Sequence, residues 1–384
     1  MSIQTVTIAR YMLSPFEIKI AKILKRKGYA VNSFNFYPPT KNQKKIFNHN
    51  YVVYNSPKKI HNVFEKIYFL KFPFFLVKFH FGTIIAVSEP NWFVSFIFLF
   101  LGRATHSKIY FPYDISYFRY KDEKNRDLEG RICEKYNFRH CDGIIHRGPE
   151  NELDYLPQSY GSARKPNIQF LGYCFTRNFQ KINDDFFMKK LAYKDKQNHL
   201  IYAGQVYHND YGQYNMIDVF RKVIDCKIHL HVYSQQYSKL IELDEYKKLI
   251  NKGYFHLHEP SYGLSFIKDI AKYDWGIMIF HPNLRIMKKI WFDTTFGSKI
   301  SSYMEAGLPS IVLKDLAFSS LIVEKYKIGI VISDEMEIKD KIEEIDYKEI
   351  IENIKKVREE FSFNSNIDRL IQFINSIEKS RGKI

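Results

Sequence analysis

The segment of residues 297–312 constrains the fold more than any other part of the chain. Its letters, GSKISSYMEAGLPSIV, predict a helix rich in small residues, then a Gly-Leu-Pro turn, then an apolar strand. A short apolar strand of this kind is typical of a parallel sheet. The helix is expected to begin at Gly297 and Ser298, with Lys299 in its first turn. Unpaired N–H groups at a helix start, with a cation beside them, form a site for a phosphate group.

Elsewhere the chain alternates between strand and helix patterns. Its 384 residues exceed one typical domain, and its 45% hydrophobic content is enough for two full cores. The alternation predicts an α/β protein with two Rossmann-like domains, each built on a parallel sheet. Strands are expected in the ranges 3–10, 29–37, 51–55, 82–91, 108–116, 143–146, 199–207, 227–234, 254–260, 275–280, 310–313 and 329–333.

The domain boundaries follow from a break in this rhythm. Residues from about 157 to 197 contain Pro157, Gly161 and Pro166 among polar runs, which predicts a connection between the domains. We therefore expect an N-terminal domain over residues 1–175 and a C-terminal domain over residues 190–364. A final helix over residues 365–384 is expected to pack back on the first domain.

Several common classes are not favoured by the motifs. No GxGxxG follows the first strand, which argues against a dehydrogenase, and no P-loop pattern occurs. The four cysteines have no metal-ligand spacing, so we expect reduced thiols in a cytoplasmic protein and no structural metal. No Asp-x-Asp occurs in the sequence either.

The positive charge is concentrated in the first half of the chain. Residues 1–184 contain 28 Lys and Arg against 14 Asp and Glu, which gives +14, whereas residues 185–384 contain 30 against 28, which gives +2. This asymmetry indicates an anionic partner, either an acidic lipid or a phosphate-linked acceptor. A nucleic acid is not expected, because no recognised nucleic-acid motif accompanies the charge.

Two aromatic and apolar stretches, residues 66–81 and 92–101, suggest contact with a membrane surface. The longer apolar run, WFVSFIFLFL, is about half of the ~20 residues that a spanning helix needs. Lysines interrupt the aromatic residues of the other stretch, as suits the lipid headgroup region. We therefore expect a peripheral protein on the inner face of the plasma membrane, in contact with anionic lipid.

From about residue 130 onward, the order of motifs resembles that of GT-B glycosyltransferases. The matching segments are RHCDGIIHRGPENELDYL, LIYAGQVY, DIAKYDWGIMIFHP and the opening helix, which is similar to the family's SK…EYMAAGLP. The resemblance implies two Rossmann-like domains that face each other across a cleft, the first for the acceptor and the second for a nucleotide-sugar donor. It also implies transfer of a sugar, most often a hexose. The basic and aromatic segments of the first half favour a lipid-linked or cell-surface glycan as the acceptor.

The chain departs from the retaining members of that family at two positions. Ser302 and Thr294 stand where those enzymes have a pair of glutamates, although Asp293 and Glu305 are close by in the sequence. The stereochemistry of the transfer therefore stays open, although the helix motif itself is of the retaining type. The family's second basic residue is also replaced, since Gln205 follows Gly204. Arg285, Lys288 or Lys289 could supply that charge.

The donor site follows from the chemistry of the leaving group, a nucleoside diphosphate. Because no Asp-x-Asp is present to hold a metal, we expect metal-independent transfer with no cofactor, assisted by helix N–H groups and a lysine. The nucleobase is expected against the loop after residues 254–260, where His258, Pro260 and Tyr262 are candidates, and beside residues 231–234. The expected donor-binding residues are Gly204, Gln205, Tyr262, Arg285, Gly297, Ser298, Lys299, Ser302 and Tyr303.

The acceptor side is expected at the carboxyl ends of the N-domain strands. Arg10, Ser14 and Asn91 are the acceptor-binding candidates there. An inverting enzyme needs a base near the acceptor hydroxyl, and Glu89 and Asp114 are the candidates for that role.

Two other functions are compatible with the same fold. A nucleotide-sugar epimerase needs no acceptor and no basic membrane-facing surface, so the charge asymmetry disfavours it. A catalytically inactive GT-B partner subunit would explain the missing pair of glutamates.

Overall fold

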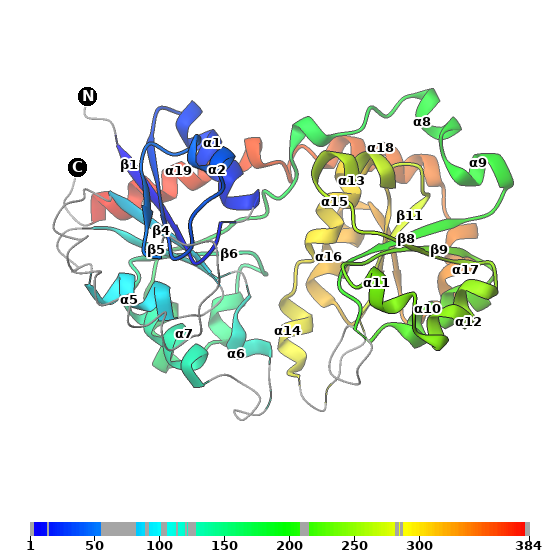
Figure 1. Ribbon diagram of the computed structural model, residues 1–384, viewed down its shortest axis with the longest axis horizontal. Helices are drawn as coiled ribbons and strands as arrows, with labels where there is room; N and C mark the ends of the chain where they lie inside the picture. Colours follow the sequence, from blue (N-terminus) through cyan, green and yellow to red (C-terminus); the bar gives the residue numbers. More distant parts are fainter. Residues whose placement is uncertain are drawn as a thin grey trace. The chain divides into compact units, whose positions relative to one another are not determined.

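The computed structural model forms two compact units (Figure 1). It describes residues 4–13, 15–54, 82–88, 92–100, 106–112, 114–119, 121, 128–207, 215–280, 284 and 287–380. Unit 1 comprises Met1–Phe170 and Ile367–Ile384, and unit 2 comprises Leu171–Asn366. Each unit is an α/β structure in which helices cover both faces of one parallel sheet (Figure 1).

Unit 1 has a seven-stranded sheet in the order β3-β2-β1-β4-β5-β6-β7, and every neighbouring pair is parallel. The first six strands lie where the sequence predicts them. The seventh, β7, was not predicted, because its three residues lie in the stretch that we interpreted as an interdomain connection. The strands are β1 (Thr5–Arg10), β2 (Ala30–Asn35), β3 (Asn50–Val52), β4 (Thr83–Ser88), β5 (Lys108–Pro112), β6 (Gly143–His146) and β7 (Asn167–Gln169).

The helices of unit 1 include one from the far end of the sequence. Helix α19 (Phe363–Ser380) packs on β6, where a Cβ at Gly143 would lie 2.8 Å from both Phe373 and Ile377. Its Glu378 accepts hydrogen bonds from the side chains of Gln4 and Thr83. The other helices are α1 (Pro15–Arg26), α2 (Lys41–Lys44), α5 (Trp92–Phe100), α6 (Ser116–Arg119), α7 (Leu128–His140), and the 3-10 turns η3 (Glu152–Tyr155), η4 (Gln158–Tyr160) and η5 (Ser162–Arg164).

Helix α5 is the apolar run that suggested membrane contact. Trp92, Phe93, Val94 and Phe98 are buried, so the helix belongs mainly to the core of unit 1, and Leu99 is 55% exposed. The other stretch, residues 66–81, lies outside the described residues. Among the helices that the structure describes, none is long and apolar enough to cross a bilayer.

Unit 2 has a six-stranded parallel sheet in the order β10-β9-β8-β11-β12-β13. This order reverses beside β8, as in a doubly wound nucleotide-binding fold, where ligands bind at the carboxyl ends of the strands. All six strands lie at predicted positions. They are β8 (His199–Ala203), β9 (His229–Tyr233), β10 (Phe255–His258), β11 (Trp275–Met278), β12 (Ser310–Leu313) and β13 (Gly329–Ile332).

The helices of unit 2 begin inside the stretch that we expected to be a connection. They are η6 (Thr176–Asn178), α8 (Asp184–Met188), α9 (Leu191–Asp195), α10 (Ile217–Asp225), α11 (Tyr237–Leu240), α12 (Asp244–Asn251), α13 (Gly263–Ile270), α14 (Lys289–Thr294), α15 (Ser298–Ala306), α16 (Ala317–Tyr326), η7 (Glu335–Glu337), α17 (Ile338–Glu343) and α18 (Tyr347–Val357). Helix α15 ends where the sequence predicts, because Gly307 adopts φ +72° and its N–H donates to the Met304 carbonyl at 3.1 Å.

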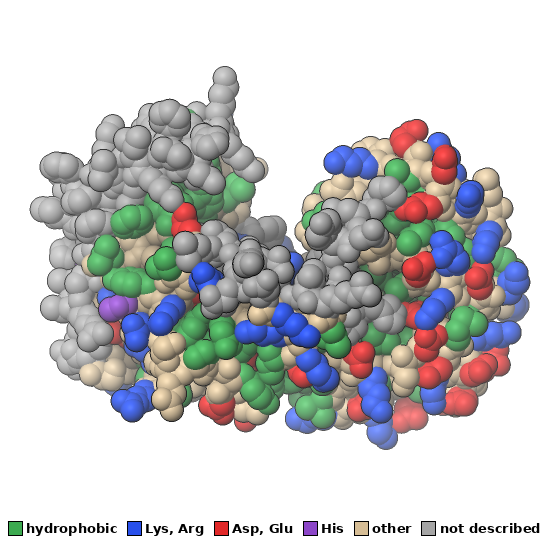
Figure 2. Space-filling view, turned by 90° about the horizontal axis from the view of Figure 1, so that it is seen from below, with side chains coloured by type: hydrophobic (Ala, Val, Ile, Leu, Met, Phe, Trp, Pro, Cys, Tyr) green, Lys and Arg blue, Asp and Glu red, His purple; other side chains and the backbone are tan. Residues whose placement is uncertain are grey.

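The surface of unit 2 mixes both signs of charge. On the face seen in Figure 2, where unit 2 is at the right, Lys and Arg side chains alternate with Asp and Glu side chains. This agrees with the near balance of charge over residues 185–384. All four cysteines are free thiols, three of them buried.

Candidate functional site

A pocket of about 210 Å³ lies at the carboxyl ends of β8, β9 and β10 in unit 2. The pocket is therefore beside the point where the strand order reverses, next to β8. Open α/β sheets bind their ligands at the carboxyl ends of the strands at such a point. The pocket includes two of the positions expected to contact a nucleobase, Pro260 and Tyr262, and residues of the Gly204 loop. The lining residues are Ala203, Gly204, Gln205, Tyr233, Gln235, Pro260, Ser261, Tyr262 and Phe266.

Helix α15 begins close to this pocket. Its N-cap is Gly297, which has no side chain to satisfy the N–H groups of the first turn. A Cβ at this position would lie 2.0 Å from the Met278 sulfur, so any larger residue would have to displace the Met278 side chain. The Gly297 N–H itself donates to Ser319 Oγ at 3.4 Å, and Ser298 is exposed. The start of the helix is therefore polar and accessible.

Lys299 lies in the first turn of α15 and points into an aromatic environment. Its Nζ is 4.5 Å from the ring centre of Phe280 and 5.1 Å from that of Tyr202. In the part of the chain that the structure describes, no carboxylate pairs with this ammonium group. Burial lowers the pKa of Lys299 to about 8. A desolvated cation held by ring faces is suited to pairing with an anionic ligand.

Gly204 lies between Lys299 and the pocket. A Cβ at this position would lie 2.9 Å from Lys299 Nζ, so the ammonium group adjoins a residue that lines the pocket. The loop is fixed from both sides: the Gly204 N–H donates to the Tyr233 carbonyl at 3.1 Å, and the Tyr202 hydroxyl donates to the Gln205 carbonyl at 2.9 Å. The Gln205 side chain is exposed.

Tyr303 does not have the accessible position that a donor-contacting residue needs. Its side chain is fully buried, and its hydroxyl lies 3.0 Å from the Ile277 carbonyl and 3.3 Å from that of Ile201. The ring fills the space above Gly276, where a Cβ would lie 2.4 Å from it. The expected direct contact is therefore corrected to a supporting one: Tyr303 ties α15 to β8 and β11. Its neighbour Ser302 is half-buried.

Of the two remaining donor candidates, Tyr262 and Arg285, the structure describes only Tyr262. Tyr262 is 64% exposed, lines the pocket and is the N-cap residue of α13. Arg285 lies outside the described residues. Lys289, one alternative source of positive charge, is exposed and forms an ion pair with Asp293 at 2.5 Å.

The residues near the family's missing pair of glutamates have structural partners. The Thr294 hydroxyl donates to the Ile290 carbonyl at 2.9 Å. The buried Glu305 carboxylate accepts from the Phe175 N–H at 2.6 Å and from Asn178 Nδ2 at 2.8 Å. Glu305 thus anchors the first residues of unit 2 to α15.

The acceptor-side candidates are placed only in part. In unit 1, Arg10 is the last residue of β1, and its guanidinium forms an ion pair with the buried Glu17. Asp114 lies just after β5 and accepts a hydrogen bond from Arg147. The other three candidates, Ser14, Glu89 and Asn91, lie outside the described residues.

One further pair in unit 1 was missed by the sequence analysis. His146 ends β6, and its Nδ1 lies 3.1 Å from the Glu152 carboxylate, with both side chains buried. Glu152 also accepts from the Gly148 N–H at 3.0 Å. Only the position of His146 at the carboxyl end of a strand could have indicated the pair, because Glu152 comes close through the turn at residues 147–151.

Comparisons with known proteins agree with this architecture. Residues 291–372, which include α15, match the model of the Glucosyltransferase 3-like C-terminal domain. A sequence comparison with curated proteins finds no match.

Solved structures that resemble the whole chain share its fold at low sequence identity. A glycosyltransferase from Rickettsia africae matches with a TM-score of 0.68 and 13% identity, over 99% of this chain and 100% of its own. Anabaena HepE, solved in complex with UDP and glucose, matches with a TM-score of 0.65 and 12% identity, over 99% and 100%. A putative UDP-N-acetylglucosamine 2-epimerase from Listeria monocytogenes matches with a TM-score of 0.61 and 11% identity, over 99% and 98%. The chain therefore has the GT-B fold, and the resemblance to GT-B glycosyltransferases that its sequence predicts is confirmed.

Proposed function

We propose that this chain is a glycosyltransferase that takes its sugar from a UDP-sugar donor bound in unit 2. The observation that supports this most is the position of Lys299, an ammonium group without a carboxylate partner among the described residues, at the start of α15 and beside Gly204. The leaving diphosphate would meet that cation and the N–H groups at the start of the helix. UDP is proposed as the nucleotide because Anabaena HepE, which has the same fold, was solved with UDP and glucose.

The pocket beside Gly204 is proposed to take the uracil. Tyr233, Phe266 and Tyr262 supply aromatic surface, and Gln205 and Ser261 supply polar groups. A mostly apolar pocket with a few polar groups is typical of sites for small ligands. Its volume of about 210 Å³ suits one part of a nucleotide sugar, with the diphosphate extending toward α15.

The donor site can be tested by nucleotide binding to the full chain in the presence of EDTA. Calorimetric titration with UDP, GDP, ADP and dTDP is expected to show UDP as the tightest ligand. At about 100 times its dissociation constant, UDP should stabilise the protein by about 2.7 kcal/mol. Lys299→Met should weaken UDP at least tenfold, whereas Lys248→Met, which changes an exposed lysine of α12, should not. Equal binding by both variants, or no binding of any nucleotide to the unmodified chain, would overturn the donor-site proposal.

Transfer without a metal ion is part of the proposal. The sequence has no Asp-x-Asp, so the diphosphate charge would be neutralised by Lys299 and the α15 N–H groups. Sugar transfer from UDP-sugar is expected to continue in EDTA. Loss of transfer in EDTA, with recovery on adding Mg²⁺ or Mn²⁺, would contradict it.

The acceptor is proposed to be a lipid-linked or cell-surface glycan, reached at the inner face of the plasma membrane. The support is the charge of +14 over residues 1–184. The chain should co-sediment with vesicles that contain anionic lipid and detach as salt is raised. Glu89 and Asp114 stay the candidates for a base, and Arg10, Ser14 and Asn91 for the acceptor contacts.

A nucleotide-sugar epimerase is the second candidate, because the Listeria monocytogenes structure named as a putative epimerase has the same fold. The two reactions differ in their products. An epimerase returns an isomeric UDP-sugar and needs no acceptor, whereas a transferase releases UDP only as an acceptor is glycosylated. If UDP binds but neither product forms with any acceptor, an inactive partner subunit is favoured.

A further inference from the structure

Five histidines stand side by side on one face of the unit 2 sheet. The strand register places His199 of β8 opposite His229 of β9, and His231 of β9 opposite His256 of β10. Neighbouring rings stack, with centroids 4.6 Å apart for His199 and His229 and 4.4 Å apart for His231 and His256. His258 completes the set and stacks on Tyr233 at 4.6 Å. None of the five lines the pocket proposed for the donor, although the sequence suggested His258 as a candidate to contact the nucleobase.

Hydrogen bonds order these rings into two chains. In the longer chain, His199 Nδ1 lies 3.0 Å from His231 Nε2, and His231 Nδ1 lies 3.0 Å from His258 Nε2. In the shorter chain, His229 Nδ1 lies 2.9 Å from His256 Nε2. The rings of His199 and His229 are parallel within 7° and use their Nδ1 atoms in the same way. Their Nε2 atoms therefore face the same side, which is the loop that follows α9.

The last residue of α9 and the loop after it supply an acceptor for each chain of rings. Asp195 Oδ2 lies 2.8 Å from His199 Nε2, and Gln197 Oε1 lies 2.9 Å from His229 Nε2. Since a carboxylate and an amide oxygen only accept, both histidines present Nε2–H to the loop and keep Nδ1 as an acceptor. All five rings, which we call the histidine ladder, therefore have the same tautomer, with the proton on Nε2, and Asp195 and Gln197 determine it.

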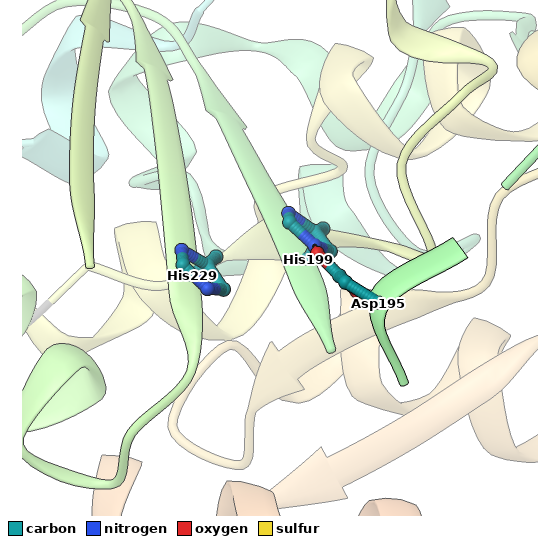
Figure 3. A group of neighbouring side chains, drawn as sticks. All are labelled: Asp195, His199 and His229. Atoms are coloured by element: carbon teal, nitrogen blue, oxygen red, sulfur yellow. Dashed lines mark hydrogen bonds and ion pairs between the residues drawn. The ribbon is translucent and has the colours of Figure 1, made fainter. Parts of the chain in front are cut away.

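We propose that Asp195, His199 and His229 form a binding site for a divalent transition-metal ion of the zinc type. One ligand atom from each of the three residues lies within 4.8 Å of the other two (Figure 3). Two imidazole nitrogens and a carboxylate oxygen are ligands that Zn²⁺ prefers, with water or the Gln197 oxygen as the fourth. Tetrahedral ligands at Zn²⁺ distances are roughly 3.4 Å apart. Asp195 Oδ2 and His199 Nε2, which are 2.8 Å apart, would therefore separate slightly on binding, and His229 would move toward them.

The ladder provides the second set of contacts that metal-binding histidines need. When Nε2 of His199 or His229 binds an ion, the ring proton moves to Nδ1 and is donated to His231 or His256. Those rings then change tautomer in turn, so every imidazole keeps one proton and none becomes charged. The Asp195 carboxylate changes its partner from an N–H group to the ion.

The site is accessible and separate from the proposed donor pocket. The Asp195 side chain is 43% exposed and His229 is partly exposed, whereas His199 is buried at 5%. His199 and His229 begin β8 and β9, so the ion would lie at the amino ends of these strands, opposite to the pocket at their carboxyl ends. Binding there would fix the α9 loop to the sheet.

The test uses the full chain without a histidine tag, stripped with EDTA and kept in metal-free buffer at pH 7.5. Titration with Co²⁺ is expected to give the intense visible absorption of a tetrahedral complex, with one ion per chain, and Zn²⁺ should displace it. Zn²⁺ should also raise the melting temperature. Weak absorption of an octahedral, solvent-like ion in the unmodified chain would overturn the proposal without any variant.

A matched pair of double variants locates the ion. Asp195→Asn/His229→Gln should lose at least tenfold in Co²⁺ affinity, whereas Asp218→Asn/His49→Gln, which changes an exposed carboxylate and an exposed histidine elsewhere, should not. Equal Co²⁺ affinity of the two variants would also overturn the proposal. UDP binding in EDTA should be the same in both, so the metal site and the donor site are judged independently.

Discussion

A Cβ placed on Gly204 would lie 2.7 Å from Lys299 Cε, so the absence of a side chain at 204 makes room for the lysine. These two residues come from different elements, the loop after β8 and the first turn of α15. Gly204 has no positive φ, so space rather than backbone conformation explains the glycine. The pair is the centre of the proposed diphosphate site.

Gly204→Ala should therefore weaken UDP binding by displacing the Lys299 ammonium. We expect a loss of about tenfold, which corresponds to about 1.4 kcal/mol. The measurement is a double-mutant cycle by calorimetry with Lys299→Ala. Once the lysine is removed, the alanine at 204 has nothing to displace, so its effect on UDP should largely disappear. Strictly additive losses would show that the two residues act separately.

The pH dependence of UDP binding follows from the same lysine. Burial lowers the pKa of Lys299 to about 8, so the residue is cationic below that pH and loses its charge above it. UDP affinity should be constant from pH 6.5 to 7.5 and then fall, approaching tenfold per pH unit at most. The terminal phosphate is already ionised in this range, since its second pKa is about 6. Lys299→Met should bind weakly at every pH, and a flat profile for the unmodified chain would contradict the role of the lysine.

Tyr303→Phe should separate support from contact. Removing the buried hydroxyl takes a hydrogen bond from the Ile277 carbonyl and should lower the free energy of unfolding by about 1 kcal/mol, while UDP affinity stays the same. Tyr262→Ala should show the reverse, because that side chain is 64% exposed and lines the pocket. Denaturant unfolding and UDP titration of both variants make the comparison. Weaker UDP binding by Tyr303→Phe would restore the direct contact expected from the sequence.

The sequence predicted the sheets well because their strands are short apolar runs with turn residues on both sides. Twelve strands were expected and all twelve are present. The three-residue edge strand β7 was missed because an edge strand this short has no pattern of its own. Pro157, Gly161 and Pro166 indicated a linker, but Pro157 and Gly161 cap 3-10 turns of unit 1, and Pro166 directly precedes β7.

The parts of the site that depend on the backbone could be predicted from the sequence, whereas the directions of side chains could not. The positions of the α15 start and of the Gly204 loop follow from the local sequence. Tyr303 shares a helix turn with Lys299, yet it points into the core. The histidine ladder was also missed, since its members come from three strands. The alternation in HLHVY and FHLH places them on one face only once the register of β8, β9 and β10 is known.

Glu305→Gln tests whether this carboxylate is structural or contacts the donor. The carboxylate accepts from two donors, the Phe175 N–H and Asn178 Nδ2. A glutamine can offer its oxygen to only one of them and must turn its own NH₂ toward the other. The buried mismatch should lower the free energy of unfolding by about 2 kcal/mol, measured by denaturant unfolding. The exposed Glu352→Gln on α18 should change it by no more than about 0.5 kcal/mol. UDP affinity at a temperature where both variants are folded should stay the same, because Glu305 faces the first residues of unit 2. A large loss of UDP affinity with full stability would instead place Glu305 in the role that the retaining family assigns to a nearby glutamate.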